Sequence, residues 1–179
     1  MRILLTFIAI MGFSCSTPET KTELPMEDKF TWNVQLAGYD HSKADPKGET
    51  TLEDFIRELD SFPWMEQIDE AAEMPDKCSP TLTVKDLKSK KNFWISMAGT
   101  STTEHGYILG YIYPKVKKGF LGLGKEKQTD WLEMRASQDK EKVVKCVNYF
   151  FKRNYESLNQ TLRRMDDFGQ MEAKNLTGM

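Results

Sequence analysis

Apolar residues recur along the chain with two periods, one typical of strands and one typical of helices. Phe30, Trp32 and Val34 alternate with polar residues, which predicts a strand with one buried face. Gly110 interrupts the most apolar of the later strands, so it marks either a bulge or a place of close packing. No helical segment separates the later strands, so their sheet should be antiparallel. The predicted strands span residues 30–36, 81–84, 93–98, 107–113 and 130–135.

Along the chain, helices are predicted both before and after the group of later strands. Residues 52–59 carry apolar side chains three and four positions apart, which forms one buried stripe. Thr50 with Glu53 would make a capping box at the start of this helix. A second short helix is expected to begin at Pro63. A longer helix should follow Ser137, and a last helical stretch follows that one.

The order of these elements predicts a single α+β domain over residues 30–168. We expect a curved antiparallel sheet of about five strands with helices packed on one face. Residues 38–48 are rich in Gly, Asp, Pro and Lys and are expected to form a loop. Residues 169–179 are expected to form a frayed C-terminal tail.

The first 14 residues have the composition of a secretory signal peptide. Arg2 supplies a positive start, and residues 3–13 are mostly apolar. About 11 residues is too short to cross a bilayer, which takes roughly 20. Residues 12–15 resemble the lipobox of bacterial lipoproteins, especially those of Bacteroidetes, in which the cysteine after the cleavage site is acylated. This resemblance predicts a signal peptide over residues 1–14 and a lipid on Cys15; the alternative is a plain signal peptide with an incidental cysteine.

The segment after Cys15 predicts a flexible tether. Residues 15–29 hold Thr, Glu, Lys and Pro with little apolar surface, so they cannot repay the entropy of ordering. With a lipid on Cys15, this tether would hold the folded domain beside a membrane of the bacterial cell envelope, in a periplasmic or outer-membrane-facing position.

Two further cysteines, Cys78 and Cys146, have two interpretations. Export would place them in a compartment that permits disulfides, so they are candidates for one bridge. The alternative is a pair of buried thiols that act as small hydrophobic residues. Sequence spacing does not decide between these, because a disulfide depends on geometry.

The net charge of −2 hides two oppositely charged segments. Residues 49–76 hold ten acidic residues and one basic residue, whereas residues 115–127 hold five lysines and one glutamate. The near balance gives no overall basic field for nucleic acid. The acidic segment is either a set of solvated helix faces or a surface that attracts a basic protein partner, with Trp64 as an anchor or as part of the core. The candidate partner-binding residues are Trp64, Glu66, Asp69, Glu70 and Glu73.

No motif in the chain predicts a catalytic site, a cofactor or a metal. Residues 119–125 fit the spacing GxxxxGK, but a phosphate-binding loop next needs Ser or Thr, and this position is Glu126. A hairpin tip is the better interpretation. His41 and His105 do not stand at the spacing of a metal site, and the chain has no GxSxG nucleophile elbow.

Several hydrophobic patterns resemble the small α+β immunity proteins of bacterial polymorphic-toxin systems. The segments are SPTLTV at 79–84, NFWISMAG at 92–99, GYILGYI at 106–112 and WLEMRA at 131–136, followed by a helix that ends in two phenylalanines. Two features depart from that pattern. The basic loop at 114–128 is longer, and the tryptophan often found after the last helix is absent.

This resemblance implies a protein that is not an enzyme and that binds and neutralises one cognate toxin. Together with the lipoprotein features, it implies a toxin that acts in the envelope, on peptidoglycan, lipid or membrane. An alternative is a surface lipoprotein that binds a glycan or another small ligand through exposed Tyr39, Trp94 or Trp131. An envelope enzyme would need a deep pocket with convergent polar groups.

Overall fold

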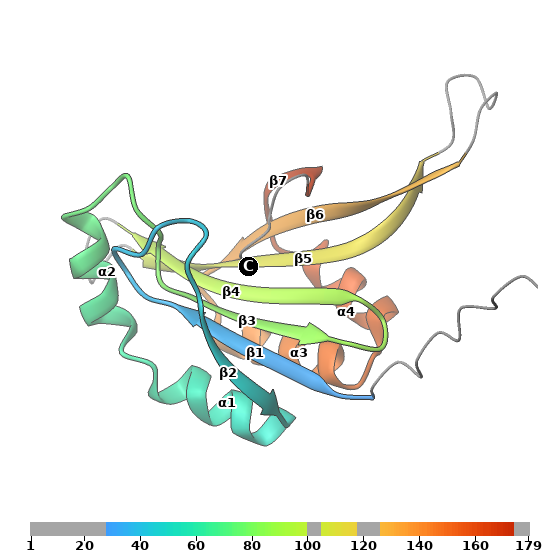
Figure 1. The fold of residues 1–179 in the computed structure, drawn as a ribbon, viewed down its shortest axis with the longest axis horizontal. Coiled ribbons are helices and arrows are strands. Elements are labelled where there is room, and N and C mark those ends of the chain that lie inside the picture. The colour runs from blue at the N-terminus through green and yellow to red at the C-terminus, as the bar shows by residue number, and fades with distance from the viewer. Residues whose placement is uncertain (1–27, 100–104, 118–125, 174–179) are drawn as a thin grey trace, which may run out of the picture.

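Seven strands form one open antiparallel sheet in the order β2-β1-β3-β4-β5-β6-β7 (Figure 1). The computed structural model describes residues 28–99, 105–117 and 126–173. The α+β class and the antiparallel pairing are confirmed, whereas the expected number of about five strands is wrong. The strands are β1 (Phe30–Gln35), β2 (Asp45–Thr50), β3 (Thr81–Asp86), β4 (Lys91–Gly99), β5 (His105–Lys117), β6 (Lys127–Ser137) and β7 (Asp166–Glu172).

The two unexpected strands are the edges of the sheet. β2 has the sequence DPKGET and lies in part of the segment expected to be a loop. β7 has the sequence DDFGQME and continues the sheet past residue 168, where the tail was expected to begin. Each pairs with one neighbour only, so neither needs the alternation of apolar and polar residues that revealed the inner strands.

Four helices complete the fold, and side chains cap three of them. Thr51 is the N-cap of α1, and its hydroxyl accepts a hydrogen bond from the backbone N–H of Asp54. The cap therefore lies one residue after the expected Thr50. Asp139 caps α3 in place of the expected Ser137. The helices are α1 (Leu52–Ser61), α2 (Trp64–Ala72), α3 (Lys140–Phe151) and α4 (Tyr155–Leu162).

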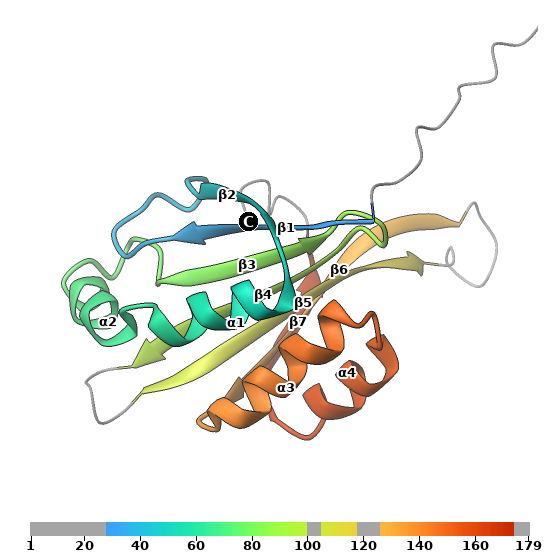
Figure 2. The same cartoon turned by 90° about the horizontal axis from the view of Figure 1, so that it is seen from below.

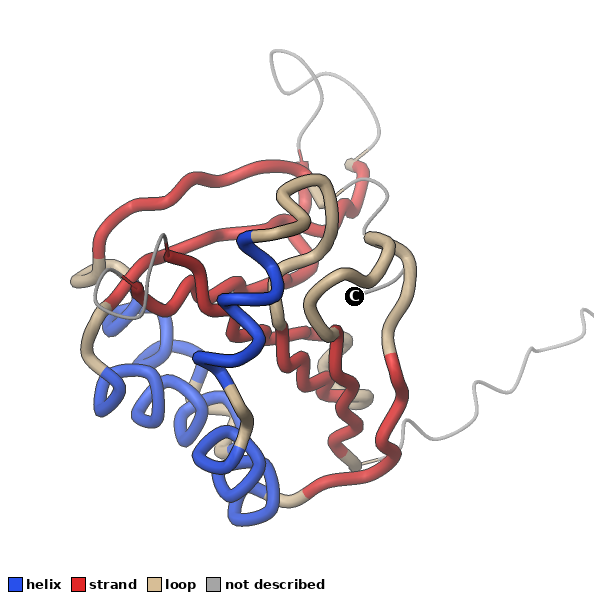
Figure 3. The backbone as a smooth tube through the Cα atoms, turned by 90° about the vertical axis from the view of Figure 1, so that its left-hand side faces the viewer, coloured by secondary structure: helices blue, strands red, loops and turns tan. Residues whose placement is uncertain are grey.

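All four helices lie on one face of the sheet, as Figures 2 and 3 show. The main core lies between these two layers. Phe150 of α3 is fully buried there, and its ring stacks on Phe93 of β4 with the centroids 5.7 Å apart. Fully buried side chains of the same core include Phe55, Leu59, Leu82, Ile95, Leu109 and Leu158.

The long axis of the domain joins two ends of different character (Figure 1). One end holds α2, the end of β4 and the beginning of β5. The other end holds the beginning of β1 and a two-stranded arm. β4 pairs with β5 only as far as Ile112, and β7 pairs with β6 only as far as Trp131, so β5 and β6 continue alone to Lys117 and Lys127. We call these the α2 end and the arm end.

Candidate functional site

Four acidic side chains form one exposed stripe on α2. The buried side chains of this helix are Trp64 and Ile68, which are four residues apart and face the core. The acidic residues follow the spacing i, i+3, i+4 and i+7, so they share one side of the helix. All four are exposed. The acidic stripe consists of Glu66, Asp69, Glu70 and Glu73.

The charges of this stripe do not stabilise the helix that carries them. Like charges three and four residues apart repel, and Glu70 and Glu73 lie near the C-terminal end of α2, where the helix dipole disfavours negative charge. No ion pair joins the stripe to a basic residue within the described part of the chain; Glu70 accepts one hydrogen bond, from the Gln67 amide at 3.0 Å. The stripe is therefore an uncompensated negative surface.

Trp64 belongs to the core and is not an exposed anchor. Its side chain is 6% exposed, and its indole N–H donates to the Leu59 carbonyl at 3.0 Å. Its ring centroid lies 4.5 Å from that of Phe62 and 6.1 Å from that of Tyr107. The apolar face of α2 covers the sheet and Trp64 lies on that face, so Trp64 is not an exposed anchor, although it lines the smaller hollow beside this helix.

A small hollow lies beside α2, and a larger groove adjoins it. The smaller, about 320 Å³, adjoins Glu66 of the acidic stripe and is walled by Met65 and Met97. The larger is a groove of about 980 Å³. His105 and Tyr107 line both, so they are neighbours on the same surface. A partner that contacts the acidic stripe therefore has apolar recesses within its reach.

The larger groove was not predicted, because five separate segments build it. It is lined by the end of β4, the beginning of β5, the end of β6, the first turn of α3 and the link from α4 to β7. Lys142 and Arg164 add positive charge to its wall, and the Phe168 side chain beside them is 54% exposed. The Nδ1 atom of His105 is buried without a hydrogen-bond partner. Nothing in the local sequence pattern around these residues marks them as neighbours.

Both cysteines of the domain are free thiols, so the candidate disulfide is not formed. Cys146 lies fully buried on α3 beneath the helical layer, and burial raises the pKa of its thiol to about 12. Cys78 lies near the loop after β1, with its Sγ 3.3 Å from Nδ1 of His41. Burial also raises the pKa of the Cys78 thiol, so the imidazole does not face a thiolate nucleophile at neutral pH. The described residues contain no cluster of three or more potential metal ligands.

The strongest polar network of the domain surrounds Asp86 and was also missed by the sequence pattern. Asp86 is 1% exposed and accepts hydrogen bonds from Arg153 to both carboxylate oxygens, at 2.8 and 3.0 Å. The hydroxyls of Tyr155 and Ser89 donate to the same carboxylate, as does the backbone N–H of Lys88. Burial opposes the charge on Asp86, but these donors outweigh it and hold the pKa well below its usual range. The network ties the β3–β4 hairpin to the link between α3 and α4, so its role is structural.

The three aromatic rings that would serve a glycan site are not open platforms. Trp94 is 7% exposed. Tyr39 is half-buried with the Lys43 ammonium 3.6 Å from its ring centroid, and Trp131 is half-buried with the Lys115 ammonium at 4.2 Å. A sugar could stack on the lysine-covered face of either ring only by displacing these lysines.

Some predicted features lie outside the described residues. These are the signal peptide, the lipidation site Cys15, nearly all of the tether, and the whole glycine-rich stretch at 119–125. Within the described ranges, none of the helices has the length and apolar character needed to cross a bilayer.

Comparison of the chain with protein-family models, with curated proteins and with solved structures finds no match in any of the three.

Proposed function

We propose that this chain is a lipid-anchored immunity protein of the bacterial envelope, which binds a cognate toxin and neutralises it by occlusion. The observation that carries the proposal is the acidic stripe of α2, which is exposed, uncompensated and adjacent to apolar recesses. A surface that repels itself in the free domain gains most from an oppositely charged partner.

The α2 end offers the three parts that a specific protein interface uses. Negative charge speeds the encounter with a basic partner and selects against acidic ones. The hollow walled by Met65 and Met97 admits an apolar side chain, which is where most binding energy concentrates. The neighbouring groove supplies further area toward the roughly 800 Å² per partner of a standard interface. Occlusion needs no catalytic group on this chain.

The test is co-purification with the product of the neighbouring gene, followed by charge reversal on the stripe. The triple variant Asp69→Lys, Glu70→Lys and Glu73→Lys should weaken binding by about tenfold or more, mainly through a slower association rate. Raising the salt concentration should weaken the parent protein in the same way.

The matched control is Glu53→Lys, which changes an exposed acidic residue of the same charged segment on α1. It should leave binding close to that of the parent. Unchanged binding of the triple variant, or an equal loss in the control, would show that the stripe is not the binding surface.

A second candidate function is a surface lipoprotein that binds a small ligand or glycan in the larger groove. Its volume of about 980 Å³ lies at the upper end of the range typical of ligand sites, and His105 brings a buried nitrogen without a partner to its wall. Soluble peptidoglycan fragments should then raise the melting temperature of the parent and not of a His105→Ala variant. No shift with any fragment would count against this candidate.

A further inference from the structure

The arm end of the domain carries a cluster of lysines that the proposed toxin-binding surface does not use. Lys115, Val116 and Lys117 end β5, and Lys127 begins β6 on the opposite side of the arm. All four are exposed, and Val116 has 56% of its surface exposed. We call these four residues the basic arm.

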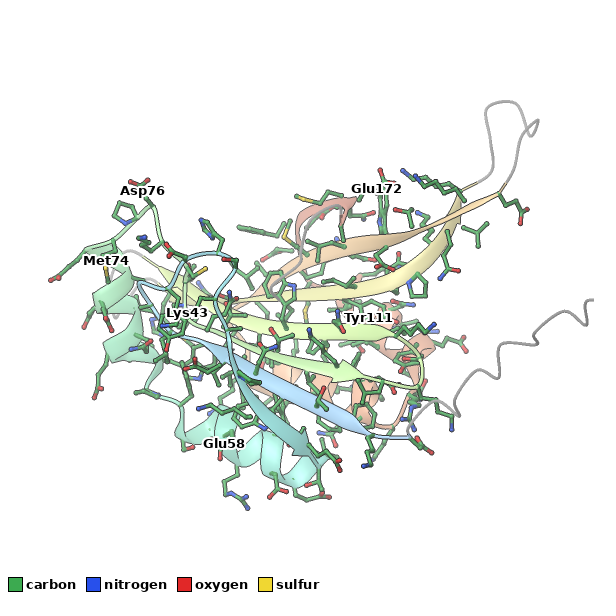
Figure 4. The ribbon with its side chains drawn as sticks, in the orientation of Figure 1. Lys43, Glu58, Met74, Asp76, Tyr111 and Glu172 are labelled. Atoms are coloured by element: carbon green, nitrogen blue, oxygen red, sulfur yellow. The ribbon has the colours of Figure 1, made fainter. Side chains whose placement is uncertain are left out.

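Two of these lysines are held over an aromatic platform. The ammonium groups of Lys115 and Lys117 lie 4.2 and 5.4 Å from the ring centroid of Trp131. The ring fixes where these positive charges are displayed, so they are less free to fold back onto the domain. Glu172 at the base of the arm pairs with Lys117 at 3.2 Å (Figure 4).

The pairing of β5 with β6 brings two lysines of the basic arm close together, and their repulsion destabilises the isolated domain. Lys117 lies directly opposite Lys127 in the antiparallel register, and like charges in that position repel. Within the described residues, the Lys127 side chain makes no ion pair or hydrogen bond. A surface that supplies negative charge to the arm would relieve this repulsion.

The position of the arm shows which negative surface lies within reach. The beginning of β1 and the arm lie at the same end of the long axis in both views, with α2 at the other (Figures 1 and 2). The chain therefore enters the domain at the arm end. Cys15 precedes Asp28 by 13 residues, which span at most about 45 Å when fully extended. A lipid on Cys15 would keep the arm end within that distance of the bilayer.

We infer that the basic arm contacts the anionic headgroups of the membrane in which the chain is anchored. This inference rests on the anchoring part of the proposed function. Lysines that lie within a Debye length of an anionic surface are attracted to it. Val116 lies between two of them in the strand, and its exposed side chain extends from the opposite face of the two-stranded arm. The acidic stripe is repelled by the same surface, so both ends of the domain favour one orientation. The arm faces the membrane and the α2 end faces away, toward a toxin.

The test uses the full lipidated chain in vesicles with a fluorescent label at one of two positions. Val116→Cys places the label on the basic arm, and the matched control Asp76→Cys places it at the α2 end, where Figure 4 labels Asp76. The other two thiols of the domain are buried and should not react. Vesicles contain phosphatidylcholine with or without 30% phosphatidylglycerol, plus a lipid that carries a headgroup quencher.

The label on the arm should be quenched strongly in the anionic vesicles and weakly in pure phosphatidylcholine. The label at position 76 should not be quenched in either. The variant Lys115→Gln, Lys117→Gln and Lys127→Gln should lose the quenching at position 116, as should 0.5 M salt. Equal quenching at both positions, or none at position 116 in an anchored chain, would overturn the inference while leaving anchoring intact.

A second measurement covers the outcome in which the chain is not lipidated. The Cys15→Ser chain and its triple lysine variant are sedimented with the same anionic vesicles. Each lysine near such a surface contributes about fivefold in partitioning, so the three together should contribute on the order of 100-fold. If the parent chain fails to anchor but this ratio is found, the anchoring proposal fails, whereas the affinity of the arm for anionic headgroups holds. A ratio near one, or tighter binding to an oligonucleotide than to the vesicles, overturns the arm inference.

Discussion

The buried carboxylate of Asp86 provides the sharpest test of the structure. Asp86→Asn keeps the size of the side chain but removes the charge and one of the two acceptor oxygens. The Arg153 guanidinium then loses its bidentate partner, and the Tyr155 and Ser89 hydroxyls lose a charged acceptor. Breaking a buried charged pair from one side costs about 3–5 kcal/mol. Because the Arg153 side chain is 28% exposed, water recovers part of that loss, and we expect about 2–3 kcal/mol.

The assay is thermal and urea unfolding of the variant beside the parent. For a domain of this size, a loss of about 2–3 kcal/mol lowers the melting temperature by roughly 4–12 °C. The matched control is Asp28→Asn, because Asp28 also pairs with Arg153, at 2.6 Å, but is 62% exposed. It should shift the melting temperature by only a small fraction of that amount.

The pH dependence of the same variant gives a second readout. The pKa of Asp86 is depressed in the folded state, so its contribution to stability is fully present above the unfolded pKa of about 4 and is lost as the pH falls below it. The difference in stability between the parent and Asp86→Asn should therefore be constant above about pH 4 and shrink as the pH falls below it. Equal effects of the two variants, or a gap that does not change with pH, would refute the network as described.

Three substitutions and one labelling experiment test other parts of the fold. Gly110→Ala should destabilise the domain by about 1–3 kcal/mol or more in thermal unfolding, because the added Cβ would lie 1.9 Å from the Trp94 indole. The control is Gly106→Ala, whose Cβ would make ordinary contacts at 3.6 Å and should be tolerated. Trp64→Ala should cost about 3–5 kcal/mol as a core residue, and a loss of toxin binding without loss of stability would contradict its burial. Thr83→Val should stabilise the domain by about 1 kcal/mol, since the Thr83 hydroxyl is fully buried without a partner, and a loss of stability would show that the hydroxyl is bonded. Both thiols of the domain should stay unreactive toward a thiol reagent in the native state and react on unfolding; fast native labelling, or a disulfide seen without reductant, would contradict the structure.

The inner elements of the fold follow from local pattern. The strand around Val34 and the helix around Phe55 and Leu59 each bury one face, so their period is visible in the sequence. The sequence also marked Gly110, whose interruption of an apolar strand indicated either a bulge or close packing; in the structure the Trp94 ring lies over it. The acidic spacing on α2 is equally local, because residues three and four apart on a helix share one side.

The edges of the sheet and the polar network depended on tertiary structure. β2 and β7 are strands because β1 and β6 offer them hydrogen bonds, not because their own residues prefer that state. Asp86 and Arg153 are 67 residues apart in the chain and meet only when the helical layer packs on the sheet.

Composition, charge segments and helix faces are properties of neighbouring residues, so the sequence by itself determined them. It could not determine whether Trp64 faced the core or a partner, because both positions satisfy the same local pattern, and only the packing of α2 on the sheet decided it. It also could not place the acidic stripe and the basic arm relative to each other. They lie at opposite ends of the long axis, and β5 runs from the α2 end to the arm (Figure 1). Such long-range placement depends on contacts between residues far apart in the chain, which local periodicity does not record.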